Sequence, residues 1–143
     1  PAARPAGRPG FFVCLAPVRR QMVNSTSTTV AMPLYSKYQV RAKMMAALAE
    51  ASALKVNIED LLNQGIDPTL ALAGGTPLTL NCRMSAEGTA ATGEGSIGCT
   101  LLNAPGAVLN KTLVLSRSPA SGWTCNTTVE ADYAPKGCAA HDT

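Results

Sequence analysis

Several residue types that support catalysis or metal binding are scarce in this sequence. Among 143 residues there is one histidine, His141, which lies three residues beyond the last cysteine. No Ser-His-Asp or Cys-His arrangement can be built around it with rigid support. Glu59 and Asp60 are adjacent on an expected helix and point about 100° apart, so they are not a facing acid and base pair. We therefore predict that the chain is not an enzyme and uses no cofactor.

Aromatic and charged residues are also few, at 4% and 15% of the chain, whereas 46% of the residues are hydrophobic. The low charged fraction argues against a disordered chain, and the length suits a single domain with a thin core of Ala, Leu and Val. No run of about 18 uninterrupted apolar residues occurs, so the sequence predicts no membrane-spanning helix.

The net charge of +3 comes from the first thirty residues, which contain four arginines and no acidic residue. Residues 31–143 contain eight basic and nine acidic residues, so their net charge is −1. This part of the chain therefore lacks the positively charged surface that binds a phosphate backbone, and we expect no nucleic-acid partner. Its basic residues are offset by acidic ones and are expected to form solvated surface: Arg83, Lys111, Arg117 and Lys136 against Glu87, Glu94, Glu130 and Asp132.

Cysteine is the residue type whose spacing is most informative. Four of the five cysteines lie in the second half of the chain: Cys82, Cys99, Cys125 and Cys138. Neither pair resembles the short Cys-x-x-Cys spacing of zinc sites, so the set predicts two disulfides, no metal and an oxidising compartment. Four cysteines allow three pairings. We favour the sequential one, 82 to 99 and 125 to 138, because both loops are short, and Cys14 is left over.

The first half of the chain divides into two parts. Residues 1–30 begin with Pro, Ala, Arg and Gly and end in a Ser/Thr tract, and we interpret them as an atypical N-terminal segment before a globular domain at 31–143. Apolar residues then recur every three or four positions until Gly65, which predicts one long amphipathic helix over 34–64. The apolar stripe consists of Val40, Met44, Ala47, Leu48, Ala51, Leu54, Ile58, Leu61 and Leu62.

Four strand-like runs rich in Thr, Leu and Val follow a loop at 65–77. They cover residues 78–84, 96–103, 111–117 and 122–129 and are separated by Gly, Pro and Ser clusters. One long helix followed by four antiparallel strands predicts an α+β domain in which the helix covers one face of the sheet.

Two motifs at opposite ends of this domain resemble one family. Gly122-Trp123-Thr124-Cys125 and Ala134-Pro135-Lys136-Gly137-Cys138 are similar to the two ends of the disulfide-bonded loop of type IVa pilins, particularly those of Pseudomonas. The run from Ala31 to Ala42 resembles the family's Ala-x-Pro-x-Tyr-x-x-Tyr-x-x-Arg-Ala at the start of its long helix. The resemblance covers about 31–138, and it implies the type IV pilin fold.

The resemblance also implies a structural role, as one of many identical subunits that form a type IV pilus on a bacterial surface. It implies adhesion to host or abiotic surface receptors, twitching motility, and handling by pilus assembly machinery after an inner-membrane and periplasmic stage. The family's apolar N-terminal helix is not evident here, because Pro17, Arg19 and Arg20 interrupt residues 1–30. We therefore interpret residues 1–30 as a non-native or altered membrane anchor. Two alternatives are a minor pilin that receives DNA in natural transformation and a type II secretion pseudopilin. The pseudopilins usually carry a calcium site instead of the C-terminal disulfide loop.

Two sets of site residues follow from the resemblance. One is an exposed loop that contacts receptors or surfaces, with packing against a neighbouring subunit as the rival role: Asn126, Thr127, Thr128, Val129, Glu130, Ala131, Asp132, Tyr133, Ala134, Pro135, Lys136 and Gly137. The other set serves filament assembly, with Tyr35, Tyr38 and Arg41 expected to contact other subunits rather than their own domain: Pro33, Tyr35, Tyr38 and Arg41.

Overall fold

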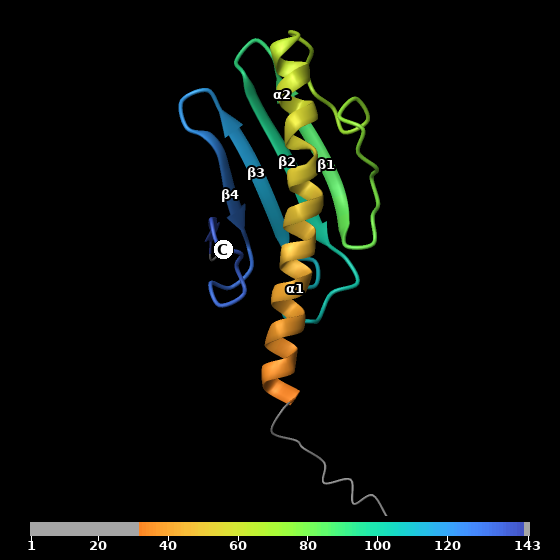
Figure 1. Cartoon of the computed structure of the whole chain (residues 1–143), viewed down its shortest axis with the longest axis vertical. Coiled ribbons are helices and arrows are strands. Elements are labelled where there is room, and N and C mark those ends of the chain that lie inside the picture. Colours follow the sequence, from red (N-terminus) through yellow and green to blue (C-terminus); the bar gives the residue numbers. More distant parts are fainter. Residues whose placement is uncertain (1–31, 142–143) are drawn as a thin grey trace, which may run out of the picture.

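A computed structural model describes residues 32–141, so the segment at 1–30 and Cys14 lie outside the described residues. Helix α1 covers Met32–Ala53 and helix α2 covers Lys55–Asn63. The two follow one another along a single column that crosses one face of a sheet (Figure 1). The lower turns of α1 project beyond the sheet, as the sequence predicted from the length of the helix.

The predicted helix over 34–64 is present, but it is interrupted at one residue. Leu54 has φ −82° and ψ −14°, and its N–H donates to Ala51 O at 3.2 Å, one residue closer than in a regular α-helix. Ile58 N–H then donates to Leu54 O at 3.0 Å, which restores the α-helical pattern. The interruption is a local tightening, and the apolar stripe continues through it because Ala51, Leu54 and Ile58 are all buried.

Gly65 ends the helix, as its position in the sequence predicted. It adopts φ +75°, a left-handed conformation that glycine reaches without a steric penalty. Its N–H donates to Leu62 O at 3.1 Å, and Ile66 N–H donates to Leu61 O at 2.9 Å. These two bonds form a Schellman motif, which satisfies carbonyl groups that the last turn leaves open.

The sheet has five strands, in the spatial order of the sequence. The first four are antiparallel, whereas the last pairs parallel with its neighbour. The strands are β1 Cys82–Thr89, β2 Glu94–Leu101, β3 Thr112–Ser118, β4 Gly122–Thr127 and β5 Cys138–Ala140. The prediction of four strands missed β5, because three residues are too few to show a strand pattern.

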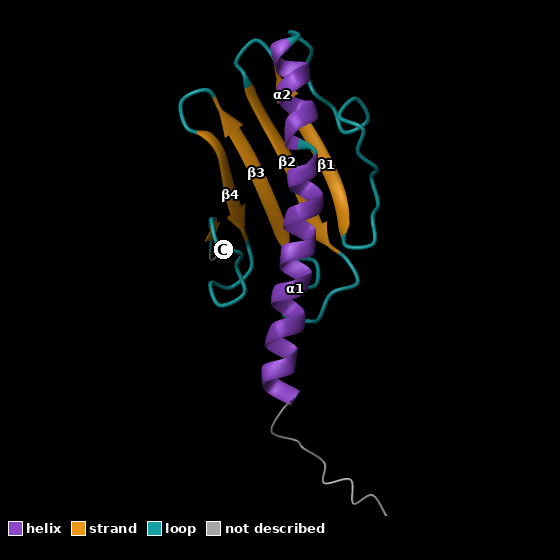
Figure 2. Ribbon diagram, viewed as in Figure 1, coloured by secondary structure: helices purple, strands orange, loops and turns teal. Residues whose placement is uncertain are grey.

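The first strand begins later than predicted, at Cys82 rather than at residue 78. Leu78 and Leu80 are exposed and belong to a loop, residues 65–81, that runs beside β1 (Figure 2). Isolated bridges join Thr69 to Glu87 and Leu78 to Arg83 along the outer edge of β1. The loop therefore covers one edge of the sheet, and β5 covers the outer edge of β4 at the other side.

The core lies between the helices and the facing side of the sheet. The helical stripe contributes Val40, Met44, Ala47, Ala51, Leu54, Ile58 and Leu62, and the sheet contributes Met84, Ile97, Cys99, Leu101, Leu113 and Leu115. Among residues 35–141 no aromatic side chain belongs to the buried set, in line with the small aromatic content. Over residues 32–141, no helix is both long enough and apolar enough to span a bilayer.

Candidate functional site

The Cys125–Cys138 disulfide closes the loop that carries the predicted contact residues. The two cysteines are direct partners on β4 and β5, with a Cα–Cα distance of 4.4 Å. Because the parallel strands and the covalent bond fix both ends, the intervening chain has little freedom of position, and a contact made by it costs less ordering entropy.

Only part of this loop is exposed, which corrects the prediction for residues 126–137. Asn126 and Thr127 belong to β4, and Thr127, Val129 and Pro135 are buried. Thr127 Oγ1 donates to Thr112 O at 2.7 Å, so its hydroxyl anchors the loop to β3. The side chains open to contact are those of a turn, Glu130, Ala131 and Asp132, and of Lys136 near the second cysteine.

The turn is tied to helix α1 through Asp132. Arg41 Nε donates to Asp132 O at 3.2 Å, and Lys37 Nζ lies 3.6 Å from Asp132 Oδ2. The ion pair is largely exposed and contributes about 0–1 kcal/mol, so its role is to orient rather than to stabilise. Arg41 was predicted to contact other subunits rather than its own domain; the structure shows that its guanidinium contacts its own loop.

A groove of about 550 Å³ lies between α1 and the turn. Arg41 and Met45 form the helix side, and Ala131, Tyr133 and Lys136 are among the residues of the loop side. Its walls combine apolar surface with charged groups of both signs, since Asp132 lies beside Arg41 and Lys136, and such a groove can bind another molecule.

The projecting turns of α1 carry the other predicted set. Tyr35 and Tyr38 are 65% and 71% exposed, and the buried stripe begins only at Val40. Pro33 lies in the first turn of α1, where a proline needs no backbone donor. Two adjacent exposed tyrosines on a helix that extends past its own sheet form a surface available to another subunit.

A polar cluster between α2 and the sheet was not predicted. Glu59 Oε1 accepts hydrogen bonds from Arg117 Nε and from the Trp123 indole, both at 2.7 Å, and Arg117 also donates to Gly93 O. The hydrogen bond from Arg117 lowers the pKa of Glu59, partial desolvation opposes this, and the bond from Trp123 adds to the lowering. Glu59 therefore stays ionised to a lower pH than an ordinary glutamate.

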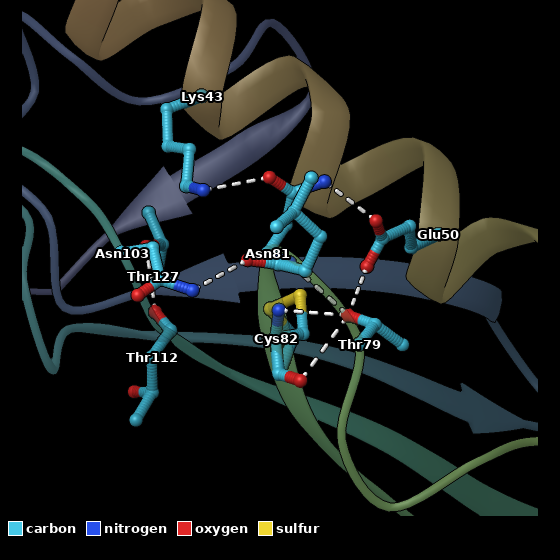
Figure 3. Close-up of a disulfide and its surroundings, with 10 residues drawn as sticks. Lys43, Glu50, Thr79, Asn81, Cys82, Asn103, Thr112 and Thr127 are labelled. Atoms are coloured by element: carbon cyan, nitrogen blue, oxygen red, sulfur yellow. Dashed lines mark hydrogen bonds between the residues drawn. A yellow bond between two sulfur atoms is a disulfide. The ribbon is translucent and has the colours of Figure 1, made fainter.

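A second network surrounds the Cys82–Cys99 disulfide, which joins β1 and β2 in the core (Figure 3). Glu50 accepts hydrogen bonds from Thr79 Oγ1 at 2.6 Å and from Asn81 Nδ2 at 2.5 Å, and Lys43 Nζ donates to Asn81 Oδ1 at 2.7 Å. These bonds fasten the end of the loop at 65–81 to α1. The network explains how a loop with exposed leucines is held in place.

The polar groups of the described residues also bear on metal binding. Within residues 32–141, no three His, Cys, Asp or Glu side chains gather in a way that could hold a metal ion. His141 Nε2 lies 3.0 Å from Asn126 Oδ1 at the surface, far along the chain from Glu59 and Asp60. The sequence analysis did not predict the Glu59–Arg117 pair. Opposite charge was the only feature of the sequence that indicated it, and the two positions are 58 residues apart.

Three comparisons with known proteins agree with one another. A family model described as pilin, a bacterial filament, matches residues 40–139. Two relatives named type IV major fimbrial protein FimA, from Dichelobacter nodosus, are 32% and 28% identical; each match covers 76% of this chain, and 82% and 83% of the relatives. The crystal structure of a Cs1 pilin chimera has a similar fold, with a TM-score of 0.58 and 23% identity over 73% of this chain and 99% of that chain.

Proposed function

Because this chain belongs to the pilin family, it is a structural subunit of a type IV pilus, and we propose which of its surfaces make the contacts of that filament. Its partners are other pilin subunits, and its place is the extracellular pilus. We also propose that the chain supports adhesion and twitching motility, and that it passes through an inner-membrane stage before assembly machinery handles it. The proposal includes no catalysed reaction.

The observation that carries the assembly proposal is the exposure of Tyr35 and Tyr38 on turns of α1 that extend past the sheet. A helix that covers its own sheet with one stripe and projects beyond it can dock against the helices of other copies. Such a contact joins unlike surfaces on successive subunits, so it propagates into an open helical fibre instead of closing.

We expect Tyr35→Ala combined with Tyr38→Ala to reduce the number of filaments by at least about tenfold. Interface aromatics of this kind contribute about 2 kcal/mol or more each when they are buried by a partner. The measurement is the yield of sheared pili from cells in which the variant is the only pilin. Circular dichroism of the purified subunit should show an unchanged fold, because neither ring contributes to the core.

Val56→Ala is the matched control, since Val56 is an exposed apolar residue on α2, over the sheet. This variant should assemble normally. Normal pilus yield from the double tyrosine variant would show that the projecting turns do not make the filament contact.

For adhesion, we propose that the exposed turn Glu130–Asp132 touches the surface to which the filament attaches. The support is its exposure beside the groove together with its fixation by the disulfide and by Arg41. Ala131 lies at this turn and has a small side chain, so a charge introduced there enters the contact directly.

Ala131→Glu is expected to reduce attachment of intact filaments to polystyrene and to epithelial cells by roughly tenfold, because an unpaired polar or charged group in a contact costs about 1–3 kcal/mol. Ala120→Glu introduces the same charge at the exposed turn between β3 and β4 and should leave attachment unchanged. Equal loss in the two variants, or no loss in the first, would contradict the proposed contact.

A further inference from the structure

A second pocket, of about 180 Å³, lies between the helices and β4 beside the C-terminal disulfide. Ser52 and Lys55 form its helix side, Trp123 and Thr124 come from β4, and Lys136 reaches it from the loop. The volume is below the roughly 300 Å³ at which pockets for drug-sized ligands begin, so it suits one ring-sized group. None of these residues belongs to the projecting turns or to the turn Glu130–Asp132.

The charges around this pocket favour an anion. The ion pairs within residues 32–141 are Lys37 with Asp132 and Arg117 with Glu59, so Lys55 and Lys136 have no carboxylate partner there. Glu59, the acidic group that contacts Trp123, is neutralised by Arg117. Two lysines without a carboxylate partner line the same polar pocket and attract a negatively charged ligand group.

Trp123 adds a fixed aromatic plane. Its indole N–H is held by Glu59 Oε1 at 2.7 Å, and Lys55 Nζ lies 5.5 Å from the ring centroid, which is within cation–π range. The hydroxyl groups of Ser52 and Thr124 supply neutral hydrogen-bonding groups at the same pocket. An aromatic plane, hydroxyl groups and amines together match a sugar ring that carries a carboxylate better than they match a bare inorganic anion.

We propose that this pocket, the lysine pocket, binds a uronic acid residue of an acidic polysaccharide, with Lys55 and Lys136 on the carboxylate. A nucleic acid is the less favoured polyanion because it needs a track of several phosphate contacts. Arg117, the other nearby base, is already paired with Glu59. The proposal goes beyond filament assembly, since this binding is a property of the single subunit.

Trp123 is the only tryptophan of the chain, so its fluorescence reports on this pocket directly. We expect trigalacturonate to change the emission of the full-length subunit in a saturable way. Maltotriose, a neutral trisaccharide of similar size, should leave it unchanged. Raising the salt concentration should weaken the trigalacturonate response, because the contact is ionic.

Lys55→Met and Lys136→Met keep the length of the side chain and remove the ammonium group. Each should weaken trigalacturonate binding about tenfold, as expected for the loss of one charge-assisted hydrogen bond. Lys111→Met is the matched control, because Lys111 is exposed, lies outside the pocket and changes the net charge equally. Its affinity should stay within about twofold of the wild type, since remote surface charges are screened.

Three results would overturn the lysine pocket. The first is the absence of a saturable response to trigalacturonate, and the second is an equal loss in the Lys111→Met control, which would reveal diffuse charge attraction. The third is tighter binding of duplex DNA that depends on Lys55 and Lys136, which would assign the pocket to nucleic acid. None of these results bears on assembly, which the tyrosine variants test separately.

Discussion

Replacing Cys125 and Cys138 together by serine is expected to lower the free energy of unfolding by at least about 3 kcal/mol. The bond closes a loop with a sequence separation of 13, and cross-linking a loop of this size removes about that much conformational freedom from the unfolded chain. The loss should be larger than this entropic value, because β5 has three residues and pairs with β4 alone. Urea denaturation of the oxidised wild type and of the variant measures the difference.

Cys82→Ala with Cys99→Ala provides the comparison, because that bond closes a loop of similar length with a sequence separation of 17. Its cysteines lie in the eight-residue ladder between β1 and β2, and we expect this ladder to persist without the bond. Amide hydrogen exchange at positions 138–140 should therefore accelerate only when the Cys125–Cys138 disulfide is removed. Full protection of β5 without the Cys125–Cys138 bond would show that the strand forms by itself.

Ile58→Ala is the second change with a large expected effect, a loss of about 2–5 kcal/mol in the free energy of unfolding. Ile58 is 0% exposed and belongs to the buried core near the C-terminal end of the helical stripe, so we expect the substitution to leave a cavity. The melting temperature should fall by roughly 8–20 °C on this scale. The exposed Val56→Ala on the same helix should change the free energy by no more than about 0.5 kcal/mol.

The partner of Ile58 on the sheet gives this prediction a sharper test. A Cβ added at Gly95 would lie 3.3 Å from Ile58 Cγ2, which is a tight contact. Gly95→Ala should therefore destabilise the wild type but cost less in the Ile58→Ala background, where the methyl group enters the cavity. Additive free-energy changes in this double-mutant cycle would contradict the direct packing of helix α2 on β2.

The sequence predicted the helix well because one physical pattern decides it. Apolar residues spaced three and four apart must face one side, and that side is buried along its whole length. The interruption at Leu54 escaped prediction because nothing in the residue type distinguishes Leu54 from its neighbours.

Strand positions were predicted less accurately, for a different reason. Leu78 and Leu80 have the apolar character of a strand, yet both are exposed in a loop that lies against the edge of β1. Conversely, β1 contains Arg83, Ser85 and Glu87 on its outer face, and these residues reduce its apparent strand character. Alternation along a half-buried strand is weaker evidence than a helical stripe, because polar residues are tolerated at every second position.

The candidate site was predicted in position but not in detail. The spacing of Cys125 and Cys138 placed the loop, whereas the burial of Thr127, Val129 and Pro135 within it depends on contacts with β3 and α1. The tie between Arg41 and Asp132 joins positions 91 residues apart, and the lysine pocket brings the helices together with β4 and the loop that follows it. Proximity of this kind follows from the topology and cannot be read from local composition.

The two covered edges of the sheet matter for a pilus subunit, because many identical copies lie close together in the filament. An uncovered edge strand exposes unpaired N–H and C=O groups, and a strand of a second chain can form hydrogen bonds with them. Such pairing leads to amyloid-like aggregates. In this protein the loop at 65–81 covers the outer edge of β1, and the short disulfide-held β5 covers the outer edge of β4. The two covered edges therefore disfavour uncontrolled β-sheet pairing between neighbouring copies.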